Sequence, residues 1–516
     1  MLVQEFLEGT ADRLPEKIGL VADGRRLTYA EIEAQSNKLA NALADSGVRR
    51  GDRVLIFLPN SLEAVLGIFA TLKAGGVFVV VNSTTRLNKL IYLANNSQAS
   101  AIILAGKQVG LIQMLFEQAP SLHCAVLATP PDENPPGISK SLSPSKNILR
   151  LSEILANSSP QRPQHRNIDL DLACLVYTSG STGEPKGVMS DHSSVDFVSS
   201  SIIQYLENTE EDVIINLLPL SFDYGLYQVL MTFKFGGRLI LERGFLYPAH
   251  ILKRVEQEKV TGFPGVPTIF AELVQIELSG FNLSSIRYLT NTAAALPVTH
   301  IEKIRSWFPF ARLFSMYGLT ETKRTLYLPP TELDRRPDSV GIAIPGTEVW
   351  LEDEMGTRLE PGQVGELVVR GRHVMRGYWQ DPESTAQRFR PGSIPGERLC
   401  YTGDQFRMDE DGFFYFVARK DDMIKSRGEK VSPLEIERVL YALEGVREVA
   451  VIGVPDPILG QAIKAFVAAP GLKIDKNMIL SHCRAHLEDF MIPRYVEIFD
   501  ELPKTSSGKI RKDDLK

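Results

Sequence analysis

The chain has 516 residues, of which 44% are hydrophobic and 23% charged, with a formal net charge of -6. This balance is ordinary for a globular protein of about two to four structural units, and its mild acidity argues against a dedicated nucleic-acid or anionic-membrane binder. The cysteines are far apart and form no CxxC pair, which indicates a reducing compartment and argues against a disulfide framework or structural zinc. Because the N-terminus is too polar for a signal peptide and no apolar run approaches roughly 20 residues, we expect a cytoplasmic protein.

Alternating helices and strands are predicted from the N-terminus onward. Thr28 and Glu31 have the spacing of a capping box, and Ile32, Leu39 and Leu43 then fall on one face of a helix. Further along, the pattern predicts a strand at 54–58, a helix at 62–73 and a Val-rich strand at 77–81. Continuous apolar strands between helices are typical of the α/β class, in which helices cover both faces of a sheet. We therefore expect a large N-terminal domain of helix-covered β-sheets over residues 1–420.

The composition changes over residues 129–166, which are rich in Pro, Ser and Asn and contain few large apolar side chains. Such a stretch is typical of a surface excursion between two halves of a domain, and we do not expect it to contribute to the core.

A smaller unit is expected after a boundary near residues 419–425. A strand at 412–417 precedes this boundary, and the spacing of Ser432 and Glu435 after it predicts a second capping box. The helix that follows has Leu434, Val439 and Leu440 as apolar positions. Strands at 449–454 and 463–468 and a helix near 478–488 complete an α+β domain over residues 421–516, large enough to fold and move as a unit.

A glycine-rich stretch, YTSGSTGEPKG at 177–187, follows an apolar run at 172–176 that reads as a buried strand. By itself such a cluster is compatible with a flexible turn. However, its glycines let backbone N–H groups converge, its hydroxyls donate hydrogen bonds, and Lys186 supplies positive charge, which together suit phosphate. The spacing fits neither a Walker loop nor GxGxxG, so another class of phosphate chemistry is indicated.

This stretch resembles the phosphate loop of the adenylate-forming superfamily, which includes acyl-CoA ligases, amino-acid adenylation enzymes and luciferases. Further segments match that family in its order along nearly the whole chain: LTYAEI, LKAGGVFVVV, LPLSFDYG, MYGLTE, GELVVRG, YTGD, ARKDDMIKSRGEKVSPLEIE and KTSSGKIRK. The resemblance implies an enzyme that joins a carboxylate to ATP with release of pyrophosphate and then passes the acyl group to a thiol. ATP and Mg²⁺ are the small molecules it implies.

The same resemblance assigns nucleotide-binding residues. Tyr317 would stack on the adenine beside Gly318, and Ala293 and Ala294 would flank the ring. The ribose hydroxyls would be held by Asp404, since one carboxylate accepts two hydrogen bonds, with Arg419 as a second contact. The β- and γ-phosphates would be gripped by Thr178, Ser179, Gly180, Ser181, Thr182, Gly183 and Lys186.

Catalytic and moving parts also follow from the resemblance. Thr320 would hydrogen-bond the α-phosphate and Glu321 would ligate Mg²⁺, a hard cation that prefers oxygen ligands. Lys509 would be the catalytic lysine that reaches between the acyl carboxylate and the α-phosphate. Asp421 matches the hinge about which the small domain turns between two half-reactions, and Gly428 would then face a tunnel for a pantetheine arm.

The acid substrate is expected to be read by the stretch after residue 218, where Phe222 is followed by Asp223. Amino-acid adenylation enzymes typically have Phe-Asp there, and an unpaired carboxylate in an apolar pocket is costly unless a substrate ammonium meets it. Asp223 could instead pair with a protein cation, Lys323 or Arg324. The continuation KRTLYLPP is closer to stand-alone acyl-CoA ligases, so acyl-CoA ligation is the alternative to amino-acid activation.

A compact apolar substrate pocket is expected by alignment, suited to a small amino acid such as proline. The acceptor would be the phosphopantetheine thiol of a separate carrier protein, with free CoA as the alternative. The expected pocket residues are Phe222, Asp223, Tyr224, Tyr227, Val266, Asn291, Met316 and Thr325.

Overall fold

The computed structural model forms two compact units, each built from several chain segments. The first consists of Met1–Pro264, Thr320–Lys323 and Gly371–Arg390, and the second of Gly265–Leu319, Arg324–Arg370 and Pro391–Lys516. Within the part of the chain that the structure describes, no helix is both long and apolar enough to cross a membrane. The described residues are 1–128, 146–164, 167–179, 184–245, 247–292, 296–420, 422–426, 429–456, 460–470, 474–505 and 508–515.

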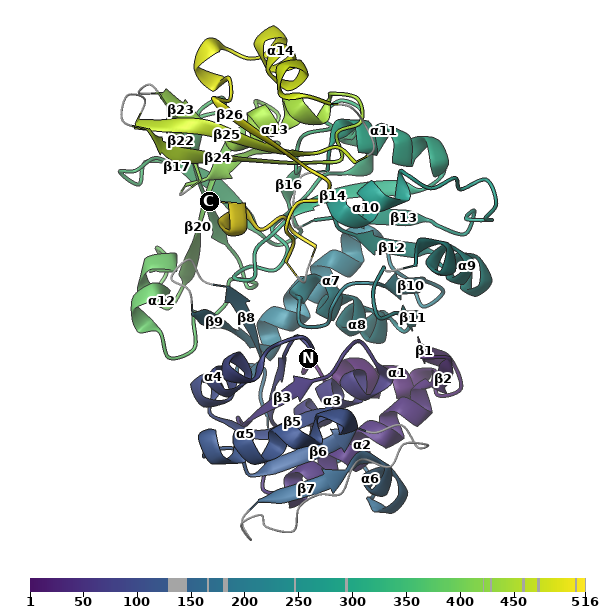
Figure 1. The fold of residues 1–516 in the computed structure, drawn as a ribbon. Helices are drawn as coiled ribbons and strands as arrows, with labels where there is room; N and C mark the ends of the chain where they lie inside the picture. The colour runs from purple at the N-terminus through teal and green to yellow at the C-terminus, as the bar shows by residue number, and fades with distance from the viewer. Residues whose placement is uncertain are drawn as a thin grey trace. The chain divides into compact units, whose positions relative to one another are not determined.

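A seven-stranded sheet organises one half of the first unit (Figure 1). All its neighbouring strands run parallel except the last two, which form an antiparallel hairpin. Its central strands are buried along their length, as expected for a parallel sheet with helices on its faces. In spatial order the strands are β7 (Asn147–Arg150), β6 (Cys124–Ala128), β5 (Ala99–Ala105), β3 (Arg53–Phe57), β4 (Val77–Val80), β8 (Leu172–Ser179) and β9 (Pro185–Asp191).

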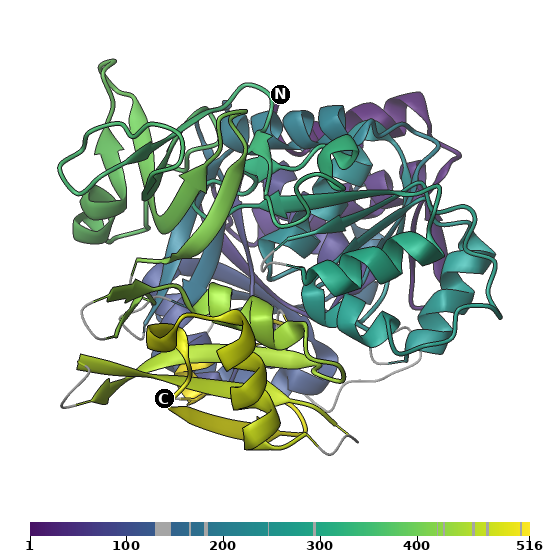
Figure 2. The same cartoon turned by 90° about the horizontal axis from the view of Figure 1, so that it is seen from above.

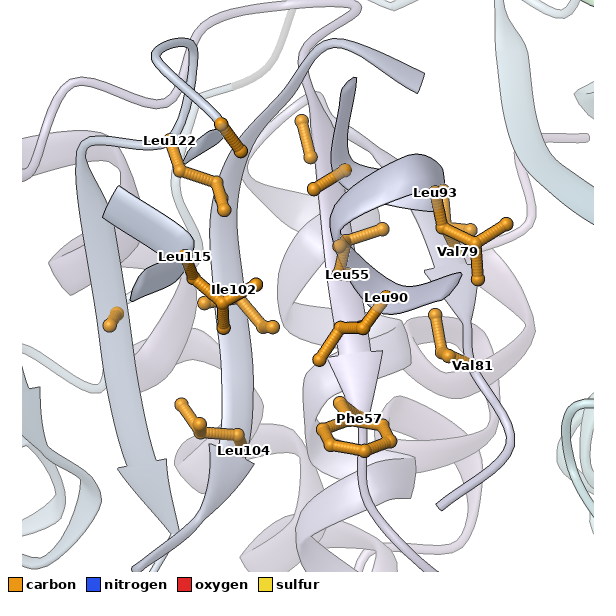
Figure 3. Packing of buried hydrophobic residues seen from close by; sticks show 14 of the residues in the cluster. Leu55, Phe57, Val79, Val81, Leu90, Leu93, Ile102, Leu104, Leu115 and Leu122 are labelled. Atoms are coloured by element: carbon orange, nitrogen blue, oxygen red, sulfur yellow. The ribbon is translucent and has the colours of Figure 1, made fainter. Parts of the chain in front are cut away.

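One face of this sheet is covered by α4 (Leu87–Ser97) and α5 (Ile112–Gln118). Figure 3 shows Leu90 of α4 beside Leu55 and Phe57 of β3, and Leu93 of α4 beside Val79 of β4, all at most 3% exposed. Leu115 of α5 joins the same cluster. Burying each such side chain contributes roughly 1.5–3 kcal/mol to stability. Leu175 of β8 belongs to the same cluster, so this packing also stabilises the strand that leads into the glycine-rich stretch.

The remainder of the first unit is a second set of strands with helices α2 (Tyr29–Asp45), α3 (Leu62–Lys73) and α8 (Asp223–Phe235). Phe69 of α3 stacks on Phe233 of α8 at 5.0 Å between ring centroids, and Tyr29 of α2 meets Phe233 edge-on at 5.5 Å. These helices therefore share one aromatic core. The strands, in order, are β2 (Arg25–Thr28), β1 (Ile18–Ala22), β11 (Arg238–Leu241), β10 (Val213–Asn216) and β12 (Gly262–Gly265).

Two predictions from the N-terminal sequence are confirmed. The N–H of Glu31 donates to Thr28 Oγ1 at 3.2 Å and the N–H of Thr28 donates to Glu31 Oε2 at 2.8 Å, a complete capping box. Helix α3 has the bounds that the pattern predicts. Other helices of this unit are α1 (Glu5–Arg13), α7 (His192–Leu206), α9 (Pro248–Glu258) and α12 (Pro382–Arg388).

The prediction that residues 129–166 contribute nothing to the core is wrong for the part that is described. Strand β7 pairs in parallel with β6, and the helix α6 (Leu151–Asn157) buries Leu151 and Ile154. An edge strand and a short helix need few apolar side chains, because only one side of each faces the core. Residues 129–145 and 165–166 lie outside the described ranges.

The second unit contains a strand pair in parallel, β13 (Tyr288–Asn291) and β14 (Arg312–Tyr317), with α10 (Pro267–Leu273) and α11 (Val298–Trp307). The short strands β15 (Leu326–Tyr327) and β16 (Ile342–Ala343) continue from β14 in antiparallel pairing. A separate antiparallel sheet follows, with β17 (Glu348–Glu352), β18 (Val364–Arg370), β20 (Arg398–Met408) and β21 (Phe414–Arg419).

The C-terminal part of this unit, yellow-green to yellow in Figures 1 and 2, is the expected α+β fold. Its core combines strand residues with Ile436 and Leu440 of α13 and Ile479 and Cys483 of α14. The elements are β22 (Ile424–Ser426), β23 (Glu429–Val431), α13 (Pro433–Tyr441), β24 (Glu448–Asp456), β25 (Gly460–Ala468), α14 (Lys476–His486) and β26 (Tyr495–Phe499).

The capping box predicted at Ser432 is wrong. Ser432 precedes α13, but its hydroxyl donates to the backbone carbonyl of Val417 and makes no cap hydrogen bond. Pro433 occupies the first helical position, where its missing N–H costs nothing. Of the apolar positions predicted for this helix, Leu440 is buried, whereas Leu434 and Val439 are only partly buried.

Candidate active site

The glycine-rich stretch joins β8 and β9, and we call these two strands and their connection the phosphate hairpin (residues 172–191). Thr178 lies opposite Lys186 across the strand pair, and Ser179 lies opposite Pro185. Gly187 packs closely on the Tyr177 ring, since a Cβ on it would lie 3.0 Å from that ring. The described ends of the hairpin therefore bring a hydroxyl and an ammonium to one end of a buried sheet, whereas Gly180, Ser181, Thr182 and Gly183 lie outside the described residues.

Lys186 is held by a segment about 200 residues further along the chain. Its Nζ lies 3.3 Å from Asp381 Oδ2, contacts the hydroxyl of Ser384, and sits 5.6 Å from the centroid of the Tyr378 ring. Burial acts to raise the pKa of Asp381, but hydrogen bonds from Ser384 and Lys186 lower it below its usual value. Lys186 is thus placed as a cation, with a carboxylate where phosphate oxygens are expected.

Glu321 is buried, and the hydroxyl of Tyr378 donates to its Oε1 at 2.5 Å. Burial and the nearby Glu321 carboxylate raise the pKa of Tyr378, so the phenol stays protonated and donates. Tyr378 therefore touches the carboxylate predicted to bind Mg²⁺ and lies beside the lysine predicted to bind phosphate. Thr320, which precedes Glu321, is partly exposed.

The chemistry of these residues fits a nucleotide-bound Mg²⁺. Among the residues that the structure describes, no cluster of three or more His, Cys, Asp or Glu side chains could hold a metal alone. Mg²⁺ in nucleotide sites is bound by one or two carboxylates and otherwise by phosphates and water. A single carboxylate with a hydrogen-bonded second oxygen, as at Glu321, matches that pattern.

Three residues predicted to hold the nucleoside meet in the second unit. The hydroxyl of Tyr317 donates to Asp404 Oδ2 at 2.6 Å, and Arg419 Nε lies 3.7 Å from Asp404 Oδ1. Asp404 and Arg419 are paired across β20 and β21. The Tyr317 ring also meets Phe406 edge-on at 4.8 Å. Asp404 is only 6% exposed, so these contacts preorganise its carboxylate. Gly318 follows Tyr317, while Ala293 and Ala294 lie outside the described residues.

Lys509 lies in a segment that we call the Lys509 loop (residues 504–510), of which the structure describes 504–505 and 508–510. Lys504 and Ile510 form its closing bridge, the N–H of Thr505 donates to the carbonyl of Lys509 at 2.7 Å, and the N–H of Lys509 donates to Thr505 Oγ1 at 3.1 Å. Gly508 has φ +82°, a left-handed conformation that favours glycine. A Cβ on Gly508 would lie 2.6 Å from Thr268 Oγ1. The loop therefore contacts the first turn of α10.

The predicted substrate residues of the first unit lie at the start of α8. Phe222 is its N-cap, Asp223 is the first helical residue, and Tyr224 and Tyr227 are buried in the same stretch. Gly225 has no alternative, because a Cβ would come within 2.4 Å of the carbonyl oxygen of Pro219. The first turn of α8 therefore packs directly against the backbone of residues 218–219.

Other predicted substrate residues lie in the second unit. Asn291 and Met316 stand at the carboxyl ends of the parallel strands β13 and β14 and are at most 4% exposed. Ligands of open α/β sheets bind at such strand ends. Val266 is the N-cap residue of α10, and its Cγ2 would be 3.4 Å from a Cβ on Gly508.

Lys323, one of the two protein cations considered as a partner for Asp223, is buried, as Asp223 is. Burial raises the pKa of the Cys174 thiol, which the Lys323 ammonium lowers and the Asp223 carboxylate raises, so both charges act on one buried sulfur. Lys323 is 1% exposed and adopts φ +61°, an uncommon backbone conformation for a residue with a side chain. The alternative in which Asp223 pairs with a protein cation therefore stays open beside pairing with a substrate ammonium.

Two functional candidates were missed by sequence reasoning. Tyr378 and Asp381 belong to the segment RGYWQDPEST, whose only local signal is Asp381 as the N-cap of α12. Their contacts to Glu321 and Lys186 come from tertiary structure. Two further predicted residues, the hinge Asp421 and the tunnel residue Gly428, lie outside the described ranges.

Comparison with known proteins identifies the family. The family model "AMP-binding enzyme" matches residues 7–379 and "AMP-binding enzyme C-terminal domain" matches residues 435–509. A long-chain-fatty-acid–CoA ligase of Bacillus subtilis (strain 168) is 32% identical, with 98% of this chain and 93% of that protein covered. A feruloyl-CoA synthase of Amycolatopsis sp is 34% identical, with 96% and 94% covered.

Solved structures agree with this assignment. The crystal structure of the anthranilate CoA ligase AuaEII in complex with anthranoyl-AMP has a TM-score of 0.90 at 26% identity and covers 100% of this chain and 96% of that one. ATP-bound MatB from Rhodopseudomonas palustris has a TM-score of 0.88 at 29% identity, covering 100% and 98%.

The curated relatives described above are named as CoA ligases, which supports the acyl-CoA ligase alternative better than the expected amino-acid activation. The match over nearly the whole chain also agrees with the large α/β domain and small C-terminal domain expected from the sequence. The chain belongs to the AMP-binding enzyme family, the adenylate-forming superfamily that its motifs resemble, and it is an AMP-forming acid–thiol ligase.

Proposed function

We propose that the chain is an acid–CoA ligase that acts on a carboxylic acid without an α-ammonium group. The observation that carries this proposal is the match, over nearly the whole chain, to relatives named as a CoA ligase and a CoA synthase. Because a buried carboxylate is stabilised by a protein cation as well as by a substrate cation, Asp223 does not require an amino acid. The named CoA-ligase relatives support the same substrate class and CoA as the acceptor.

The reaction has two steps. In the first, an oxygen of the substrate carboxylate attacks the α-phosphorus of ATP, the bond from that phosphorus to the bridging oxygen breaks, and pyrophosphate leaves with the electron pair. In the second, the deprotonated thiol of CoA attacks the acyl carbon, the bond to AMP oxygen breaks, and AMP leaves. The thiol proton passes to solvent.

The first step brings two anions together, so fixed positive charge must stabilise the transition state. We assign Lys509 to the space between the substrate carboxylate and the α-phosphate, and Lys186 to the β- and γ-phosphates, with Thr178, Ser179 and Thr320 as hydroxyl donors. Glu321 would hold Mg²⁺, which adds positive charge at the phosphate oxygens. The hydrogen bond from Tyr378 keeps the Glu321 carboxylate oriented.

Tyr317, Asp404 and Arg419 would hold the nucleoside, since one carboxylate can accept from both ribose hydroxyls. Asp404 already accepts from Tyr317, so a bound ribose must share or replace that hydrogen bond. The predicted domain boundary at residues 420 and 421 would let the small domain turn, withdrawing Lys509 before the thiol arrives.

We propose a compact aromatic or short apolar acid as substrate. Tyr224 and Tyr227, which the resemblance places in the substrate pocket, are 1% and 2% exposed at the start of α8, and two bulky rings there would leave less room for a long alkyl chain. ATP–pyrophosphate exchange should be measured with benzoate-type, cinnamate-type, short-chain and long-chain acids, and with amino acids including proline. Exchange with aromatic or short acids and with no amino acid is expected. If only amino acids support exchange and none of the other acids does, the proposal is wrong and the chain activates an amino acid.

A second measurement separates the role of Asp223 from that of the pocket. Asp223→Asn should change exchange with simple acids by less than about tenfold, because no substrate charge depends on it. If Asp223 binds a substrate ammonium, the loss should instead reach about 100-fold or more. Thioester formation with CoA and with a phosphopantetheine-loaded carrier protein, assayed separately, identifies the acceptor; product with the carrier alone would contradict the CoA assignment.

A further inference from the structure

The Lys509 loop is attached to the C-terminal sheet by one buried carboxylate. Glu448, the first residue of β24, is 4% exposed. Its Oε2 accepts from the backbone N–H of Leu502 at 3.0 Å, and its Oε1 lies 2.7 Å from Lys504 Nζ. Leu502 lies two residues before Lys504, which closes the loop by its bridge to Ile510. A single side chain therefore fixes both the entering backbone and the base of the turn that carries Lys509.

We propose that Glu448 is a positioning residue for the first half-reaction, which acts by holding the base of the Lys509 loop so that the Lys509 ammonium reaches the α-phosphate. This inference rests on the proposed role of Lys509. Glu448 itself touches no substrate; its partners are Lys504 and the Leu502 backbone, and its effect passes to Lys509 through the hydrogen bonds within the turn.

The other end of the loop is attached separately. Lys512 Nζ lies 2.8 Å from Glu437 Oε1 and donates to the carbonyl of Val451 at 3.1 Å. Leu515 and Leu502 are buried in one apolar cluster with side chains of β24 and β25. Substitution of Glu448 leaves these contacts in place. We therefore expect the C-terminal segment to stay packed on the sheet, while Lys509 is no longer held in position. Glu448 is the attachment nearest to Lys509 on the entering side.

The charges around Lys504 show which partner matters. Burial acts to lower the pKa of Lys504, but hydrogen bonds to Glu448 and Glu501 raise it above its usual value. The Glu501 side chain is 67% exposed and that of Glu448 is 5% exposed. Screening by water makes the exposed contact weak, whereas the buried one fixes geometry. Glu501 is therefore a matched control: the same residue type on the same lysine without burial.

The experiment compares Glu448→Gln with Glu501→Gln in both half-reactions. A glutamine at position 448 can still accept the hydrogen bond from the Leu502 N–H. It carries no negative charge, so it cannot form an ion pair with Lys504. Exchange measured with the enzyme's own acid should fall about 10- to 100-fold in kcat for Glu448→Gln, with KM for ATP nearly unchanged. Thioester formation from synthetic acyl-adenylate and CoA should stay within about twofold, because Lys509 is needed only in the first step. Glu501→Gln should resemble the unaltered enzyme in both.

Equal losses in both half-reactions would indicate a purely structural role and would overturn the inference, as would wild-type exchange in Glu448→Gln. A double-mutant cycle adds a sharper readout. In a Lys509→Ala background, Glu448→Gln should have no further effect on residual exchange, and a full additional loss would also overturn it. If Lys509→Ala alone exchanges normally, the proposed function of Lys509 has failed; if only Glu448→Gln is normal, the present inference alone has failed.

Discussion

Two lysines predicted to act on ATP, Lys186 in the phosphate hairpin and Lys509 in the Lys509 loop, have different surroundings. In the phosphate hairpin the lysine itself is held, since Lys186 contacts Asp381 and Ser384. In the Lys509 loop the attachments lie beside the lysine, at Lys504 and Lys512, which bind Glu448 and Glu437. The first arrangement presents a cation that must exchange a carboxylate for phosphate. In the second arrangement the ion pairs of Lys504 and Lys512 involve neighbours of Lys509, so they can persist when Lys509 acts.

This difference suits the two roles. A group that binds the ground state can exchange partners at small cost, because only the difference between carboxylate and phosphate contacts matters. A group that acts in the transition state must already be aimed, since displacement of about 1 Å can cost about 100-fold in rate. Substitutions in the two turns should therefore separate into effects on KM for ATP and effects on kcat.

The largest expected effect is at Lys509. Lys509→Ala should lower kcat for ATP–pyrophosphate exchange about 100- to 1000-fold, because it removes a charge aimed at the transition state. Equilibrium binding of ATP should change little, as measured by calorimetry. If Lys509→Ala exchanges at nearly the wild-type rate, Lys509 takes no part in the chemical step, and the proposed contrast between Lys186 and Lys509 is wrong.

The glycines beside the two lysines come next. Gly508→Ala introduces a Cβ 2.6 Å from Thr268 Oγ1 at φ +82°, so kcat for exchange should fall about 10- to 100-fold. Gly187→Ala instead meets the Tyr177 ring at 3.0 Å, and we expect its effect mainly on KM for ATP. A KM effect in Gly508→Ala without loss of kcat would contradict the proposed division.

Lys186 is expected to contribute binding more than rate. Lys186→Ala should raise KM for ATP about tenfold, the usual value of a charge-assisted hydrogen bond, with a smaller change in kcat. Lys186→Arg serves as the control that keeps the charge. If kcat falls more steeply than KM rises, then Lys186 also stabilises the transition state and the two turns are less distinct than proposed.

The smallest effect is expected from releasing Lys186. Asp381→Asn removes the carboxylate that competes with phosphate, so KM for ATP should fall about two- to fivefold, as for a partly exposed ion pair. Asparagine can still cap α12, so the thermal midpoint should change little. A raised KM would mean that Asp381 orients Lys186 and does not compete with the nucleotide.

The sequence reached some parts of the fold because local chemistry was enough there. The capping box at Thr28 and the bounds of α3 follow from hydrogen-bonding side chains and periodicity alone. The capping-box spacing gave a wrong prediction at Ser432, whose hydroxyl donates to the carbonyl of Val417 and makes no cap hydrogen bond. The hydroxyl of a capping residue can bond any donor or acceptor that the fold brings near it. Local sequence spacing does not show which strands lie near it in the folded protein.

The site shows the same division. The sequence by itself determined the superfamily, the candidate lysines and the candidate Mg²⁺ carboxylate, because they lie in motifs that match that family in its order along the chain. Only the tertiary structure brought Tyr378 to Glu321, Asp381 to Lys186 and Glu448 to the Lys509 loop. These contacts join residues separated by 50 to 200 positions, and their strength depends on burial, which no local pattern contains.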